Sequence, residues 1–177
     1  KLIVMSELPH VTIAIPTYNR EKWLRETLEG LTTQDYPADR LEILIIDNNP
    51  PDQTRAVVDS FSGAQHPPKY LLESQQGANF ARNRALAEAT GEIIVYGDDD
   101  ILMGPTWLRE LMQPFVNDPE KKIGAVAGEV VPVFPEGWPD WVRSFHGPQA
   151  LRPDLGPTDA KHVPMSANLA LRRDALR

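Results

Sequence analysis

In the segment "EIIVYGDDD" (residues 92–100), a run of apolar, β-prone residues ends directly in three consecutive carboxylates. At about 4 Å and an effective dielectric near 20, each like-charge pair costs on the order of 4 kcal/mol. Water, a basic neighbour or a metal ion must offset this repulsion. The segment therefore predicts a buried strand that carries a polar site at its carboxyl end.

Similar strand-like runs alternate with helical periodicity on both sides of this segment. Strands are predicted at residues 11–15, where Pro16 would stop the strand, and at residues 41–46, 69–73, 123–128 and 130–133. Two helices are predicted from their start signals, one after Asn19 as its cap and one with Pro51 in its first turn. A third is predicted over residues 79–89, with Gly91 as its stop signal, and a fourth over residues 105–115. The pattern predicts an α/β, Rossmann-like fold with a mixed, mostly parallel sheet and helices on both faces.

Three of the predicted strands end in polar residues. These residues are Thr17, Tyr18 and Asn19; Asp47, Asn48 and Asn49; and Asp98, Asp99 and Asp100. Ligands of such sheets bind at the carboxyl ends of the strands, and neighbouring parallel strands end at the same edge. An acidic loop is ordinarily solvated surface, but its position here favours a metal site. Oxygen ligands without His or Cys favour Mg²⁺ or Mn²⁺.

Composition limits the possible partners and cell compartments. The 177 residues include 18 basic and 25 acidic side chains, for a net charge of −7 and no basic excess that would drive nucleic-acid binding. The absence of cysteine excludes a disulfide-stapled fold and fits a reducing cytoplasm. No apolar run approaches the roughly 20 residues of a transmembrane helix. We therefore expect a cytoplasmic protein, with the inner face of the membrane as a second possible location.

Four motifs in this order resemble those of family 2 glycosyltransferases. They are "VTIAIPTYNR" (11–20), "IIDNN" (45–49), "GANFARNRALAEATGEIIVYGDDD" (77–100) and "SANLALRRDAL" (166–176). The resemblance implies the GT-A fold and transfer of a sugar from a nucleotide-diphospho-sugar donor to an acceptor hydroxyl, with inversion. It favours a UDP-sugar as donor and leaves the acceptor open among glycans, lipids and small molecules.

The resemblance also implies roles for individual residues. The donor-binding set would be Pro16, Thr17, Tyr18, Asp47, Asn48, Arg82, Asp98 and Asp99. Tyr18 would stack on the base, Asp47 and Asn48 would lie by the base and ribose, and Mn²⁺ or Mg²⁺ would bind Asp98 and Asp100. Family members often have Asp where this chain has Asn48. An alternative interpretation of Arg82 is a solvated helix arginine.

The resemblance assigns no catalytic base to this chain. The acidic motif that usually follows a segment like "SANLALRRDAL" has no match before Arg177, so we expect a chain cut before its base. The expected division is an N-terminal extension (1–10), a donor-binding region (11–128) and an incomplete acceptor-side region of the same domain (129–177). The alternatives are a nucleotide- or carbohydrate-binding module without catalysis and a nucleotidyltransferase, although "IPTYNR" lacks the glycine-rich loop of the latter.

The last third of the chain gives three weaker predictions. Trp138, Trp141 and Phe145 could form an apolar platform for a sugar or simply fill a core. Residues 147–162, rich in Pro and Gly, are predicted to form a mobile lid on the acceptor side. Arg172 and Arg173 are predicted to decorate the exposed start of a helix.

Overall fold

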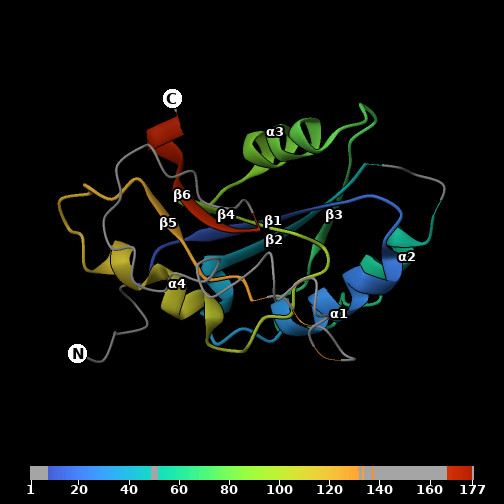
Figure 1. Ribbon diagram of the computed structural model, residues 1–177, viewed down its shortest axis with the longest axis horizontal. Helices are drawn as coiled ribbons and strands as arrows, with labels where there is room; N and C mark the ends of the chain where they lie inside the picture. The colour runs from blue at the N-terminus through green and yellow to red at the C-terminus, as the bar shows by residue number, and fades with distance from the viewer. Residues whose placement is uncertain (1–7, 49–51, 132, 134–136, 138–166, 177) are drawn as a thin grey trace.

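A computed structural model of the protein describes residues 8–48, 52–131, 133, 137 and 167–176 (Figure 1). Within these residues one six-stranded sheet has the order β3-β2-β1-β4-β6-β5. The strands are β1 (Val11–Thr17), β2 (Leu41–Asp47), β3 (Lys69–Leu72), β4 (Ile93–Gly97), β5 (Ala125–Ala127) and β6 (Asn168–Arg172). The helices are α1 (Glu21–Leu31), α2 (Thr54–Asp59), α3 (Ala78–Glu88) and α4 (Trp107–Val116), with 3₁₀ turns at Ala38–Arg40 and Arg173–Leu176.

Helices cover both faces of the sheet, as predicted (Figure 1). On one face α1, α2 and α4 pack apolar side chains such as Leu28, Val58 and Met112 against the central strands. On the other face α3 contributes the small buried residues Ala81 and Ala85, together with the partly buried Leu86. Every residue of β2 is buried, so its central residues 43–46 are apolar on both faces, and its two acidic residues, Glu42 and Asp47, accept hydrogen bonds.

The four strands β3, β2, β1 and β4 are parallel, whereas β6 runs antiparallel between β4 and β5. The predicted mixed, mostly parallel sheet is therefore confirmed. The prediction missed β6 and was wrong about a strand at residues 130–133, because Val130, Val131 and Val133 lie outside any strand. It was also wrong about Arg172, which ends β6 and lies 10% exposed beside Asp118 instead of starting an exposed helix.

Two predicted boundaries of β1 and α1 were wrong. β1 continues through Pro16 to Thr17. The backbone carbonyl of Thr17 faces β2, where it accepts a hydrogen bond from Asn48 N. Backbone groups of successive strand residues face opposite neighbours, so those of Pro16 face β4. Pairing between β1 and β4 already stops at Ala14. The missing N–H of Pro16 thus breaks no ladder bond. Asn19 has φ 53° and precedes the actual cap, Arg20, at the start of α1.

Gly91 does not end a helix, as the sequence had suggested. Helix α3 ends at Glu88 with Ala89 as its cap. A Cβ atom on Gly91 would instead lie 2.5 Å from the backbone N of Thr12 and 2.9 Å from the carbonyl O of Ile93. Glycine is needed here because the chain passes against the backbone of β1 before it enters β4.

Several predictions concern residues that the structure does not describe. They are the role of Pro51 in a first turn, the aromatic cluster Trp138, Trp141 and Phe145, the lid at residues 147–162, and Asn49 at the end of the second strand. Helix α2 begins at Thr54, after Gln53 as its cap, and the backbone N of Thr54 donates to Asp52 Oδ1 at 2.8 Å. At the start of the chain Leu8 is already fully buried in the core.

Glu42 is a buried carboxylate at the opposite edge of the sheet from the acidic loop. Lys69 donates to Oε1 at 2.8 Å, and Thr12 and Thr90 donate to Oε2 at 2.7 and 2.8 Å. Burial by itself would raise the pKa of Glu42, but the hydrogen bonds from Lys69, Thr90 and Thr12 lower it from 4.5 to about 2. The folded protein therefore stabilises the ionised form of the Glu42 carboxylate.

This pKa predicts acid sensitivity. Because the folded pKa is depressed, the stabilisation is fully present above pH 4.5 and is lost as the pH falls towards 2. Allowing for the exposure of Lys69, we expect Glu42→Gln to lower the free energy of unfolding by about 2 kcal/mol at pH 7. Urea unfolding from pH 7 to pH 3 should show this difference shrinking with acidity. Glu88→Gln, at an exposed pair with Arg84, is the control, and a pH-independent deficit in the Glu42 variant would contradict the assignment.

Candidate active site at the carboxyl edge of the sheet

The acidic loop after β4 is tied to the end of β1 through Asp99. The Thr17 hydroxyl donates to Asp99 Oδ2 at 2.6 Å, and Asp99 is only 5% exposed. Burial raises the pKa of Asp99 above its ordinary value, although the Thr17 hydrogen bond and the charge of Arg20 act in the opposite direction. Asp99 therefore joins two strand ends that lie 82 residues apart in the chain.

Basic side chains offset the repulsion within the carboxylate triplet. Arg20, the residue before α1, places Nη1 2.6 Å from Asp100 Oδ2 and 3.4 Å from Asp99 Oδ1. Arg82 on α3 places Nη2 3.9 Å from Asp98 Oδ1. Asp99 and Asp100 thus share the charge of Arg20, and Asp98 pairs with Arg82 from α3.

A buried glutamine anchors the chain that follows the acidic loop. Gln34, fully buried after α1, donates to the carbonyl oxygens of Gly30 at 2.9 Å and Gly104 at 2.8 Å. Its Oε1 accepts from the backbone N of Leu108 at 3.0 Å. These bonds connect the end of α1 to the start of α4 and hold the segment between Asp100 and α4 in place.

The end of β2 supplies Asp47, which stands beside Thr17 in the β1–β2 register. Asp47 is 2% exposed and accepts from the Tyr70 hydroxyl at 2.7 Å. Burial and the hydrogen bond to Asp47 raise the pKa of Tyr70 to about 12, so this hydroxyl stays protonated and continues to donate. The β2 end is thus held in place from the neighbouring β3 strand.

The amide of Asn48 is fully engaged in shaping the segment that leads into α3. Its Nδ2 donates to the carbonyl oxygens of Glu73 at 2.9 Å and Gln75 at 2.7 Å, and its Oδ1 accepts from Gly77 N at 2.7 Å. Gly77 has φ 134°, a conformation that glycine adopts without a steric penalty. An aspartate could not donate to the two carbonyl groups, which gives a physical reason for Asn at this position.

Asp98 and Asp100 are the carboxylates of the triplet that face solvent, with side chains 43% and 45% exposed. Among the residues that the structure describes, no three acidic or His side chains converge as a complete metal cage would require. Mg²⁺ and similar ions typically use one or two carboxylates and complete their shell with water and substrate phosphates. The oxygen donors of Asp98 and Asp100 fit a site of that kind.

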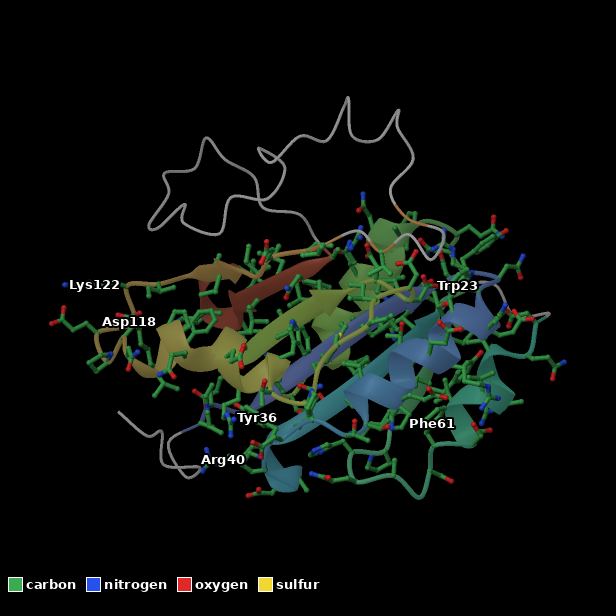
Figure 2. All side chains as sticks on the ribbon, turned by 60° about the horizontal axis from the view of Figure 1, so that its bottom comes forward. Trp23, Tyr36, Arg40, Phe61, Asp118 and Lys122 are labelled. Carbon is green, nitrogen blue, oxygen red and sulfur yellow. The ribbon has the colours of Figure 1, made fainter. Side chains whose placement is uncertain are left out.

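Of the remaining predicted donor-binding residues, Pro16 lies within β1 and Tyr18 directly follows it with 48% exposure. Trp23 is near this end of the molecule, and Asp118 and Lys122 are at the opposite end (Figure 2). A cavity of about 240 Å³ lies at that opposite end. There Arg172 already pairs with Asp118, and Arg40 donates to the carbonyl of Leu8, so the polar strand ends are the better candidate site.

The structure brings together most of the predicted site residues. Thr17, Asp99 and Asp100 form one connected group through Arg20, Arg82 reaches Asp98, and Asp47 lies next to Thr17 in the register. Sequence analysis missed Arg20 and Tyr70. Arg20 stands at the end of "VTIAIPTYNR", so its position one residue before a helix at a strand end was an available signal.

The sheet and the helices that cover it have the architecture of the GT-A fold. The sequence model of "Glycosyl transferase family 2" matches residues 12–177, nearly the whole chain. The chain therefore belongs to glycosyltransferase family 2.

Individual relatives agree with this membership. Glycosyltransferase AglE of Haloferax volcanii is 31% identical over 75% of this chain and 43% of its own length. Among solved structures, the mannosyltransferase PcManGT of Pyrobaculum calidifontis, in complex with GDP-Man and Mn²⁺, has a TM-score of 0.67 at 26% identity. That match covers 96% of this chain and 46% of that one. TarS 1–349 of S. aureus in complex with UDP has a TM-score of 0.62 at 26% identity, covering 73% and 38% of the two chains.

The chain spans less than half the length of the curated relatives that it matches. Within the described residues, no helix is both long enough and apolar enough to cross a membrane.

Proposed function

We propose that this chain forms the donor-binding part of an enzyme that transfers a sugar, with inversion, from a nucleotide-diphospho-sugar to an acceptor hydroxyl. The observation that carries the proposal is the connected group at the carboxyl edge, where Thr17, Arg20 and Asp99 join β1 to the acidic loop. Membership of glycosyltransferase family 2 supports the reaction class and disfavours the nucleotidyltransferase alternative.

In this proposal the site residues bind and orient the donor. The exposed ring of Tyr18 stacks on the base, and Pro16, Thr17, Asp47 and Asn48 form the wall beside the base and ribose. The Asn48 amide makes its hydrogen bonds to residues 73–77, so we propose that Asn48 shapes this wall and does not itself bind the nucleotide. Asp98 and Asp99 border the ribose, and Arg82 holds Asp98.

We further propose that Asp98 and Asp100 hold one divalent cation, Mn²⁺ or Mg²⁺, together with the donor diphosphate. When bound, such a cation stabilises the negative charge that develops on the leaving nucleoside diphosphate. The solvent exposure of both carboxylates supports this assignment, and so does the Mn²⁺ in the PcManGT complex. We assign no catalytic base within residues 1–177.

The donor nucleotide and the cellular location are part of the same proposal. We favour a UDP-sugar, as for the UDP-bound TarS structure, with GDP-sugars as the competing class because PcManGT was solved with GDP-Man. The proposed location is the cytoplasm or the inner face of the membrane, which fits a chain without cysteine. We propose residues 11–128 as the donor-binding region and residues 129–177 as acceptor-side structure.

Metal-dependent nucleotide binding is the test of this function. Calorimetry of UDP and GDP binding with Mn²⁺ should give a measurable affinity for at least one nucleotide, and EDTA should abolish it. A thermal-shift panel should show the same pattern, because a ligand that binds only the native state raises its stability. Equal affinity with and without metal for each nucleotide that binds would contradict the metal assignment.

A binding module without catalysis is the second candidate, and it predicts a different result with intact donor. With the full-length protein, UDP-sugars and GDP-sugars incubated with Mn²⁺ should release nucleoside diphosphate in the presence of an acceptor. Tight binding without turnover for every donor would favour the module.

A further inference from the structure

Arg20 supplies a positive charge to the acidic loop in the absence of any ligand. One guanidinium nitrogen, Nη1, contacts both Asp100 Oδ2 at 2.6 Å and Asp99 Oδ1 at 3.4 Å. The Arg20 side chain is 51% exposed, whereas the side chain of Asp99 is 8% exposed. The guanidinium can therefore leave Asp100 towards solvent without uncovering core, and Thr17 continues to hold Asp99 through its 2.6 Å hydrogen bond.

The position of this guanidinium conflicts with a divalent cation at the same carboxylate. Asp100 has lone pairs for two partners, but a guanidinium and a divalent cation on one carboxylate repel each other strongly at such separations. While Arg20 stays on Asp100, it disfavours the cation. A cation that binds Asp100 must therefore displace the Arg20 side chain or bring compensating negative charge.

A nucleoside diphosphate provides that negative charge and a new partner for Arg20. The planar guanidinium fork matches phosphate oxygens in a bidentate geometry, which the two separate carboxylates of Asp99 and Asp100 do not offer to Nη1. Arg20 caps the start of α1 and lies three residues after the end of β1, so its side chain starts from the same edge as the proposed donor site.

We propose that Arg20 is a positioning residue: it neutralises the acidic loop in the ligand-free protein and exchanges Asp100 for the diphosphate when cation and nucleotide bind together. This inference rests on the proposed function. It makes the two ligands mutually dependent, because the cation binds weakly until the nucleotide removes Arg20. By linkage, each ligand then tightens the other by the same factor.

The test measures binding and needs no turnover. Mn²⁺ affinity is measured by electron paramagnetic resonance with and without saturating UDP or GDP, for the parent protein and Arg20→Gln. We expect Arg20→Gln to bind Mn²⁺ alone about tenfold more tightly than the parent, with the nucleotide-induced tightening reduced by about the same factor. Arg20→Lys, which keeps the charge, should stay within about twofold of the parent.

Arg84→Gln is the matched control, because it removes the same charge from a half-exposed pair with Glu88 on α3 and should leave Mn²⁺ binding unchanged. If Arg20→Gln binds Mn²⁺ no more tightly than Arg84→Gln while the parent still couples Mn²⁺ to a nucleotide, the role of Arg20 is refuted and the proposed function stands. If neither UDP nor GDP changes the Mn²⁺ affinity of the parent protein, the proposed metal-assisted function itself is contradicted.

A measurement on the parent protein covers the case in which Arg20→Gln does not fold. In ¹⁵N-arginine spectra, the Arg20 guanidinium signal, assigned through Arg20→Lys, should shift when Mg²⁺ and the nucleotide are added together. It should shift far less with Mg²⁺ alone. An unchanged signal in the saturated ternary complex would overturn the exchange.

Discussion

Gly91→Ala is expected to lower the free energy of unfolding by about 3 kcal/mol, because the added methyl group would overlap backbone atoms in the centre of the sheet. The new Cβ would lie 2.5 Å from Thr12 N, 2.7 Å from the carbonyl C of Val11 and 2.9 Å from Ile93 O. Backbone in a central strand cannot move as a flexible side chain would. Urea unfolding followed by circular dichroism measures the loss.

Gly63→Ala is the matched control for this substitution. A Cβ at Gly63 would meet no atom within 4 Å, so the same chemical change should be neutral or stabilise by up to about 1 kcal/mol. Comparable unfolding midpoints for Gly91→Ala and Gly63→Ala would show that β4 does not enter the sheet against β1 as described. A large difference between the two variants would confirm that Gly91 is required by packing.

Asp100→Asn is expected to weaken metal-dependent nucleotide binding by about 100-fold or more, since even residues that only support metal ligands change affinity by about 10- to 100-fold. The substitution removes a charge from the half-exposed carboxylate proposed for the cation. Calorimetry with UDP or GDP in the presence of Mn²⁺ measures the effect. The fold should be retained, because Asp100 lies at the surface and Arg20 keeps Asp99 as a partner.

Asp59→Asn is the charge-matched control, because the Asp59 side chain is 63% exposed and pairs with Arg55 across one turn of α2. It should bind nucleotide and metal like the parent. If Asp100→Asn also binds like the parent, the metal ligands lie elsewhere. Thermal unfolding in EDTA should place both variants close to the parent, which separates a lost ligand from a lost fold.

Local patterns in the sequence were sufficient for the general architecture. Continuous apolar runs mark buried parallel strands, and β2 is indeed buried at all seven positions. Polar residues directly after such runs predict a shared site, because parallel neighbours end at one edge, and Thr17 and Asp47 are partners in the register. Periodicity and strand direction are short-range properties, so they can be recognised without knowledge of the contacts.

Boundaries and caps were predicted less well, for a related reason. Pro16 normally interrupts a ladder, but here its missing N–H faces a side where pairing has ended. Gly91 has the residue type and position of a helix stop signal, yet its actual constraint comes from Thr12, which lies far away in the chain. In both cases the deciding neighbour belongs to another strand, and no local pattern contains it.

By itself, then, the sequence determined a mostly parallel sheet with a polar carboxyl edge and an acidic loop that requires a counter-charge. Only the tertiary structure decided which group supplies that charge. Arg20 and Asp100 are 80 residues apart, and both lie in segments where a charged side chain would ordinarily face water. Likewise β6 joins the sheet from the far end of the chain, antiparallel between β4 and β5. Strand pairing and ion pairing over such separations depend on the complete packing of the chain, because that packing alone brings these groups within reach of each other.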